Sequence, residues 1–185
     1  MGNNRSRSHR QSSKVAFCGL MAALSVAWML MGGVIPIATY CVPMASAALL
    51  LPILLEYGKK AAWTMYAAVS LITLVLGVDK EAAFFYLFLG YYPLLKWEIE
   101  RAVPRRLRLP CKLLLFNAAI ALMYVTLGFL LNMHAVVEEF TQMGAALLVV
   151  FAILLNLCLL LYDRLMYPLV FLYVKKIKPR LRFLR

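Results

Sequence analysis

A stretch of 41 residues, Val15 to Leu55, contains no Asp, Glu, Lys or Arg. A transmembrane helix needs about 20 consecutive, mostly apolar residues, so this stretch is long enough for about two crossings. Gly32, Gly33 and Pro36 favour a turn between them. The stretch therefore predicts a pair of membrane-spanning helices, which excludes most folds available to a soluble chain of this length.

The composition of the whole chain indicates the same class. Of its 185 residues, 64% are hydrophobic and only 15% are charged, against roughly 25% charged residues in a typical soluble domain. A chain of this size leaves too much surface to hide so many apolar residues from water. The sequence therefore predicts an all-α integral membrane protein and excludes a soluble enzyme and a disordered chain.

Charged and turn-forming residues divide the chain into six apolar segments. We expect a bundle of six transmembrane helices, at about residues 15–35, 41–56, 61–78, 82–95, 113–133 and 140–162. The fourth segment is short for a crossing unless the Lys96 side chain extends to the interface and Trp97 anchors there. The aromatic stretch at residues 90–96 is interpreted as an interface belt with a proline. The sixth helix can continue past Asp163 toward Pro168.

Basic residues lie almost entirely on one side of this predicted bundle. With the N-terminus inside, the inner segments hold 19 of the 20 Lys and Arg residues, and the outer segments hold only Lys80. Because basic residues gather in cytoplasmic loops, we expect both termini in the cytoplasm. The net charge of +12 is thus a topology signal, and we expect no nucleic-acid partner. The predicted organisation is a basic cytoplasmic tail at 1–14, a six-helix domain at 15–174 and a second basic tail at 175–185.

The sequence carries no motif for catalysis or cofactor binding. It has no G-x-x-x-x-G-K-[ST] motif for ATP, and its four cysteines have no metal-binding spacing. The predicted helix interiors contain no buried ionisable side chain of the kind that proton-coupled carriers use. We therefore expect neither an enzyme nor a stand-alone pump, and neither a cofactor nor a metal.

The first predicted helix carries Gly19, Ala23 and Ala27 at intervals of four residues. Small residues at this spacing form a ridge that lets another helix approach closely. The ridge is either a docking face for a partner subunit or an internal packing face of the bundle.

The predicted outer face combines several polar side chains, with a formal charge of −3. These residues are Tyr40, Asp79, Lys80, Glu81, His134, Glu138 and Glu139. A carboxylate in a partly dehydrated setting attracts a cation more strongly than in water, and Tyr40 is available for a cation–π contact. We therefore expect this face to bind a cationic or zwitterionic small molecule. The alternative is that the tight turns there simply require polar residues.

The chain has six predicted helices, predicted cytoplasmic termini and no ATPase motif, and its first helix contains Ala23-Leu24-Ser25-Val26-Ala27. In these features it resembles the substrate-binding S components of energy-coupling factor transporters. In that family an A-x-x-x-A pattern on the first helix contacts a transmembrane T component, and two ATPase subunits drive uptake. The resemblance implies a multi-pass protein of a bacterial plasma membrane that binds a vitamin or similar micronutrient. The alternative is a non-catalytic structural or regulatory protein of the bacterial envelope, such as a morphogenesis subunit.

Overall fold

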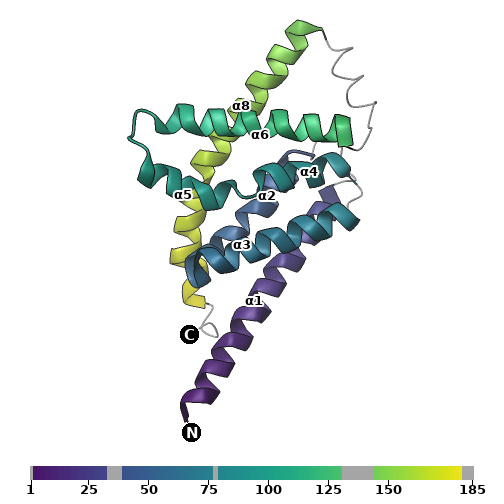
Figure 1. The fold of residues 1–185 in the computed structure, drawn as a ribbon. Helices are drawn as coiled ribbons and strands as arrows, with labels where there is room; N and C mark the ends of the chain where they lie inside the picture. Colours follow the sequence, from purple (N-terminus) through teal and green to yellow (C-terminus); the bar gives the residue numbers. More distant parts are fainter. Residues whose placement is uncertain (1, 33–38, 77–78, 131–143, 181–185) are drawn as a thin grey trace.

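The computed structural model describes residues 2–32, 39–76, 79–130 and 144–180, and all regular elements among them are helices (Figure 1). In chain order they are α1 (Gly2–Gly32), α2 (Cys41–Ala48), α3 (Leu50–Leu76), α4 (Lys80–Leu89), α5 (Tyr92–Ala102), α6 (Arg108–Leu130), α8 (Ala145–Leu172), the π-helical turn η2 (Tyr173–Ile177) and the 3-10 turn η3 (Lys178–Arg180). The prediction of an all-helical chain is confirmed for these residues.

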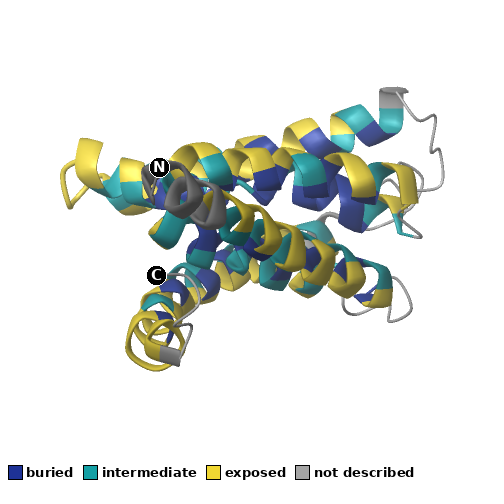
Figure 2. Cartoon of the chain, turned by 90° about the horizontal axis from the view of Figure 1, so that it is seen from below, coloured by how far each residue is buried: buried dark blue, intermediate teal, exposed yellow. Residues whose placement is uncertain are grey.

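Several helices are long and apolar enough to cross a membrane. Three qualify individually: Gln11–Gly32 in α1, Arg108–Gly128 in α6 and Leu147–Ile177, which runs from α8 through η2. α2 and α3 meet at a bend of 53° and form a fourth candidate when counted as one broken span. The outward helix faces are rich in exposed residues, many of them Leu, Val and Ile (Figure 2), and large exposed apolar surfaces require a partner or a membrane. The described helices are thus compatible with a multi-pass membrane protein. They provide three or four candidate spans, whereas the sequence predicts six.

α3 extends across the boundary between the helices predicted at 41–56 and 61–78. Inside it, Gly58 has φ 78° and ψ −178°, a backbone conformation that glycine adopts without the strain a side chain would cause. α3 is therefore two helical pieces joined by a kink at Gly58. This residue lies within the break that the sequence predicted.

The single helix predicted at 82–95 is instead two helices, α4 and α5, separated by Gly90 and Tyr91. Pro93 lies in the first turn of α5, where its missing N–H costs no hydrogen bond, whereas in a helix interior it would remove one. At Gly90 an added Cβ would lie 2.4 Å from the Tyr86 carbonyl oxygen. The backbone therefore breaks at a glycine and restarts at a proline.

The helices at the two ends of the chain are longer than predicted. α1 begins at Gly2. Residues 2–14, predicted as a tail, therefore form one continuous helix with the apolar segment that follows them. α8 passes through Asp163 and Pro168 to Leu172. The boundaries predicted after residues 14 and 174 therefore fall inside α1 and η2, not between elements.

Among the described residues, two groups of buried side chains form the core. The first joins α4, α6 and α8 and includes Phe85, Phe116, Met123, Leu127 and Leu159. The second joins α1 to α4 and includes Phe17, Leu50, Met65, Val69 and Tyr86. α4 contributes to both groups and therefore lies between the two halves of the core.

Candidate functional site

Three polar side chains from separate elements meet at one end of the bundle. The Glu81 carboxylate, in the first turn of α4, accepts hydrogen bonds at Oε1 from the hydroxyl groups of Tyr40 (2.6 Å) and Tyr124 (2.8 Å). The rings of Phe85 and Phe151 contact the Tyr40 ring edge-on, with centroid distances of 5.3 and 6.0 Å. We call Tyr40, Glu81 and Tyr124 the Glu81 cluster. In this cluster the half-buried Glu81 carboxylate lies beside aromatic rings.

Two other residues of the predicted ligand site contact helix ends. Asp79 is the N-cap of α4, and its Oδ1 accepts a hydrogen bond from the Ala82 backbone N–H at 3.1 Å. Lys80 donates to the Leu74 carbonyl oxygen, 3.2 Å away, near the end of α3. Both contacts are those expected of polar residues at a tight turn.

The structure brings Tyr40 and Glu81, two residues of the predicted ligand site, within hydrogen-bonding distance of each other. The predicted residues His134, Glu138 and Glu139 lie outside the described residues. Sequence analysis missed Tyr124, because it lies within an apolar helix 43 positions from Glu81. The sequence offered one signal for Tyr124. The predicted topology places its end of α6 on the same side of the membrane as the start of α4.

A second polar cluster lies where α5, α6 and α8 meet. Asp163 of α8 accepts hydrogen bonds from the Tyr92 hydroxyl (2.6 Å) and from Lys112 (2.9 and 3.0 Å to its two carboxylate oxygens). The Lys96 ammonium lies 3.0 Å from Asp163 Oδ1 and also donates to the Asp163 carbonyl oxygen. Lys112 is 2.7 Å from Glu100 Oε1. We call these five residues the Asp163 network.

This network corrects two expectations from the sequence. The Lys96 side chain is 0% exposed and does not extend to an interface; its ammonium lies 3.8 Å from the centroid of the Tyr167 ring. Asp163 lies inside α8, so an ionisable side chain is largely buried within a helix. Two lysines face two carboxylates, and this balance offsets the high cost of removing charge from water.

The Gly90–Lys96 stretch is not simply an aromatic belt. Tyr92 is buried, and with Lys96 it supplies two of the five members of the Asp163 network. Tyr91 instead stacks on Trp63, with a centroid distance of 6.2 Å. The helix break after α4 therefore positions two polar side chains against α8.

Glu100 is held in its charged form. Burial of the carboxyl opposes ionisation, but hydrogen bonds from Lys112 (2.7 Å) and Tyr167 (2.8 Å) and the positive charges nearby outweigh this effect. The pKa of Glu100 therefore lies below its ordinary value. The Glu100–Lys112 pair thus remains an ion pair at neutral pH.

The two polar clusters lie toward opposite ends of α6 and α8. On α6, Lys112 and Tyr124 are 12 residues apart, which corresponds to about 18 Å along the helix. On α8, the same number of residues separates Phe151, beside Tyr40, from Asp163. The two helices therefore connect the clusters.

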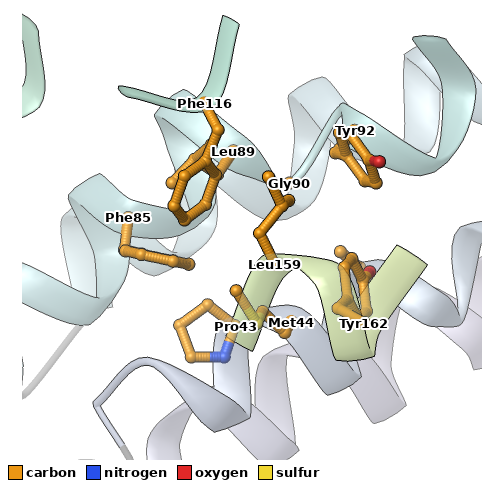
Figure 3. Close-up of a pocket in the computed structure, with 10 residues that line it drawn as sticks. Pro43, Met44, Phe85, Leu89, Gly90, Tyr92, Phe116, Leu159 and Tyr162 are labelled. Carbon is orange, nitrogen blue, oxygen red and sulfur yellow. The ribbon is translucent and has the colours of Figure 1, made fainter. Parts of the chain in front are cut away.

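A small apolar cavity lies between the clusters, lined by Phe85, Phe116, Leu159 and Tyr92 among others (Figure 3). Its volume is about 10 Å³, enough for about one water molecule. Pockets for small-molecule ligands typically measure about 300–1,000 Å³. The cavity is therefore a packing feature of the core.

The ridge predicted on the first helix faces away from the other described helices. Gly19, Ala23 and Ala27 are all exposed, whereas Phe17 and Met29 on the opposite face of α1 are buried. A Cβ added at Gly19 would have no atom within 4 Å. No described part of the chain covers the ridge.

Comparisons with protein-family models, with curated proteins and with solved structures give no match to this chain. Within the described ranges, no group of three or more His, Cys, Asp and Glu side chains is arranged to hold a metal ion. The Glu81 cluster, the Asp163 network and the exposed ridge are therefore the features from which a function is inferred.

Proposed function

We propose that the chain crosses the membrane six times, with both termini in the cytoplasm. The kink at Gly58 divides residues 41–76 into two crossings, and the bend between α2 and α3 lies inside the first of them. α4 with the first turn of α5 provides another crossing. α1, α6 and α8 complete the six. The distribution of Lys and Arg supports this topology, as does the position of the start of α1 and the end of η3 at the same end of the molecule (Figure 1).

The protein is, in this proposal, a substrate-binding membrane subunit similar to an S component. It binds a cationic or zwitterionic micronutrient at its outer face, and a T component with two ATPase subunits drives uptake. The observation that carries the proposal is the convergence of Tyr40 and Tyr124 on the Glu81 carboxylate. In the proposed topology this cluster lies at the outer end of the bundle, away from the basic segments.

The chemistry of the cluster favours a cationic group. Both tyrosine hydroxyls donate to Oε1 of Glu81. A carboxylate in this half-buried position attracts a positive charge more strongly than one in water. The Tyr40 ring, with Phe85 and Phe151 beside it, offers the aromatic surface that ammonium groups favour.

The exposed ridge on α1 supports the proposal that a partner subunit docks there. Gly19, Ala23 and Ala27 leave a shallow surface without long side chains, and such surfaces allow close helix approach in a membrane. This face points away from the buried side of α1. A transmembrane T component is the partner that the ridge accommodates in this proposal.

Ligand binding tests the proposal directly. Small molecules retained by the mildly purified protein are identified by mass spectrometry, and a panel of cationic, zwitterionic and anionic compounds is screened by thermal shift. Binding of the compound found is then measured by calorimetry for the wild type and for Glu81→Gln. We expect the substitution to weaken binding by about 1–3 kcal/mol, because a charge-assisted contact is lost.

Glu98→Gln is the matched control, because Glu98 is an exposed glutamate paired with Lys59 in α3. It should bind the compound as the wild type does. Equal affinity of the wild type and Glu81→Gln would remove the cluster from the ligand site. Failure of every cationic and zwitterionic compound to bind would favour the alternative of a structural envelope protein.

A further inference from the structure

An open groove of about 490 Å³ runs between α1 and α3. This volume is within the range of sites that hold small molecules. Small residues on both helices, Gly19 and Ala22 on α1 and Ala61 and Ala68 on α3, leave the space unfilled. Lys14 and Lys60 also line the groove. It is therefore an apolar trough with positive charge.

Both lysines lie at the same end of the groove. The Lys14 ammonium is 5.7 Å from the centroid of the Tyr57 ring, and Tyr57 precedes Lys60 by three residues. Within the described residues, neither Lys14 nor Lys60 forms an ion pair. The adjacent Lys59, in contrast, pairs with Glu98. Two positive charges at this end of the groove thus have no counter-charge among the described residues.

The charge and shape of the groove match those of an amphiphile. From Lys14 to Ala22 and from Lys60 to Ala68, each helix rises about 12 Å along the groove. We propose that this groove binds an anionic phospholipid, with its phosphate between Lys14 and Lys60 and an acyl chain along the small residues. In the proposed topology, the charged end faces the inner leaflet, where anionic headgroups attract basic residues.

A protein helix fits the groove less well than a lipid does. An apolar helix placed there would bury Lys14 and Lys60 without a counter-charge, at a high cost in a membrane. The groove lies beside the ridge on α1 and shares Gly19 with it. A bound lipid would therefore border the proposed docking face while leaving Ala23 and Ala27 free of it.

Native mass spectrometry of the delipidated protein in detergent tests this inference without depending on topology or on the micronutrient. Phosphatidylglycerol is titrated against phosphatidylcholine of the same chain length. We expect the double variant Lys14→Gln/Lys60→Gln to bind phosphatidylglycerol about tenfold or more weakly, because two charges near the headgroup are lost. Its binding of phosphatidylcholine should stay unchanged. Lys175→Gln/Lys176→Gln, an equal charge change on exposed residues outside the groove, is the matched control.

A second substitution probes the apolar part. Ala22→Phe fills the trough and should weaken binding of both lipids, whereas Ala67→Phe, on an exposed position of α3 outside the groove, should not. Equal phosphatidylglycerol affinity in the Lys14→Gln/Lys60→Gln variant and its control would overturn the proposal. Equally effective competition by inorganic phosphate would do so as well, as would capture of a protein instead of a lipid by a photo-crosslinker at Thr64.

Discussion

The Lys96 ammonium lies 3.0 Å from Oδ1 of Asp163, and this lysine side chain is 0% exposed. Lys96 comes from α5 and Asp163 from α8, 67 positions later in the chain. The pair therefore joins two helices that are distant in sequence. Because Lys112 shares the same carboxylate, loss of Asp163 would leave two ammonium groups facing Glu100 alone.

We expect Asp163→Ala to lower the free energy of unfolding in detergent by about 3–5 kcal/mol, because it leaves a buried lysine without its partner. Replacing both members of the pair, as in Lys96→Met/Asp163→Leu, should cost less than Asp163→Ala alone. The exposed Lys59–Glu98 pair supplies the control: Glu98→Ala should cost at most about 1 kcal/mol. Similar losses for Asp163→Ala and Glu98→Ala would mean that the network does not stabilise the fold.

The stability that Glu100 contributes should depend on pH. The pKa of Glu100 in the folded protein lies below its ordinary value, so its ionised form stabilises the fold above about pH 4.3, the ordinary glutamate pKa. This contribution is lost as the pH falls through the lower, folded-state pKa. Unfolding of the wild type and of Glu100→Gln should therefore differ more at pH 7 than at pH 3. A difference that does not change with pH would contradict the ionised Glu100–Lys112 pair.

The proposed topology predicts which positions an impermeant thiol reagent reaches from outside intact cells. In a cysteine-free background, Lys80→Cys should be labelled and Arg106→Cys should not, although both positions are exposed in the protein. Arg106→Cys should become reactive once the membrane is permeabilised. Labelling of Arg106→Cys in intact cells would contradict the proposed six-crossing topology.

Added bulk on the α1 ridge should prevent partner docking. Ala23→Leu and Ala27→Leu place larger side chains where a partner helix must approach closely, so each variant should fold and bind ligand but lose co-purification with a T-type partner. Ala118→Leu makes the same change on an exposed position of α6 and should leave co-purification intact. If Ala23→Leu and Ala27→Leu also leave it intact, the ridge is not the docking face.

Asp79 should affect stability through the end of α4. Asp79→Ala removes the acceptor for the Ala82 N–H and should lower the unfolding free energy by about 1 kcal/mol, whereas Asp79→Asn retains a good N-cap and should change it little. Thermal unfolding in detergent distinguishes the two. Equal stability of Asp79→Ala and the wild type would show that the cap contributes nothing.

Parts of the fold follow directly from local chemistry. The uncharged stretch from Val15 predicts the apolar part of α1, and the interruption near Gly58 is visible because charged residues and a glycine separate two apolar runs. The break at Gly90 was missed, because the apolar character of the segment continues through it. A glycine followed by Pro93 was the local signal for that break.

The candidate sites were less accessible from the sequence. Tyr40 and Glu81 carry polar groups at predicted turns, so their proximity follows from the order of the helices. The sequence predicts Lys96 at the interface, because the segment at 82–95 is short for a crossing and a lysine side chain can extend from a helix end. The partner of Lys96 is Asp163, and a pairing across 67 positions depends on tertiary packing that no spacing pattern encodes.

The polar contacts between α6 and α8 run in opposite directions along the two helices. Lys112 contacts Asp163, and further along α6 the amides of Asn117 and Asn156 exchange hydrogen bonds of 2.9 and 3.2 Å. Sliding one helix past the other by a single turn, about 5.4 Å, would break both contacts together. In the proposed topology Asn117 and Asn156 lie within the membrane, where no water replaces a lost partner. α6 and α8 therefore have one register of lowest energy, in which the Lys112–Asp163 and Asn117–Asn156 contacts both form.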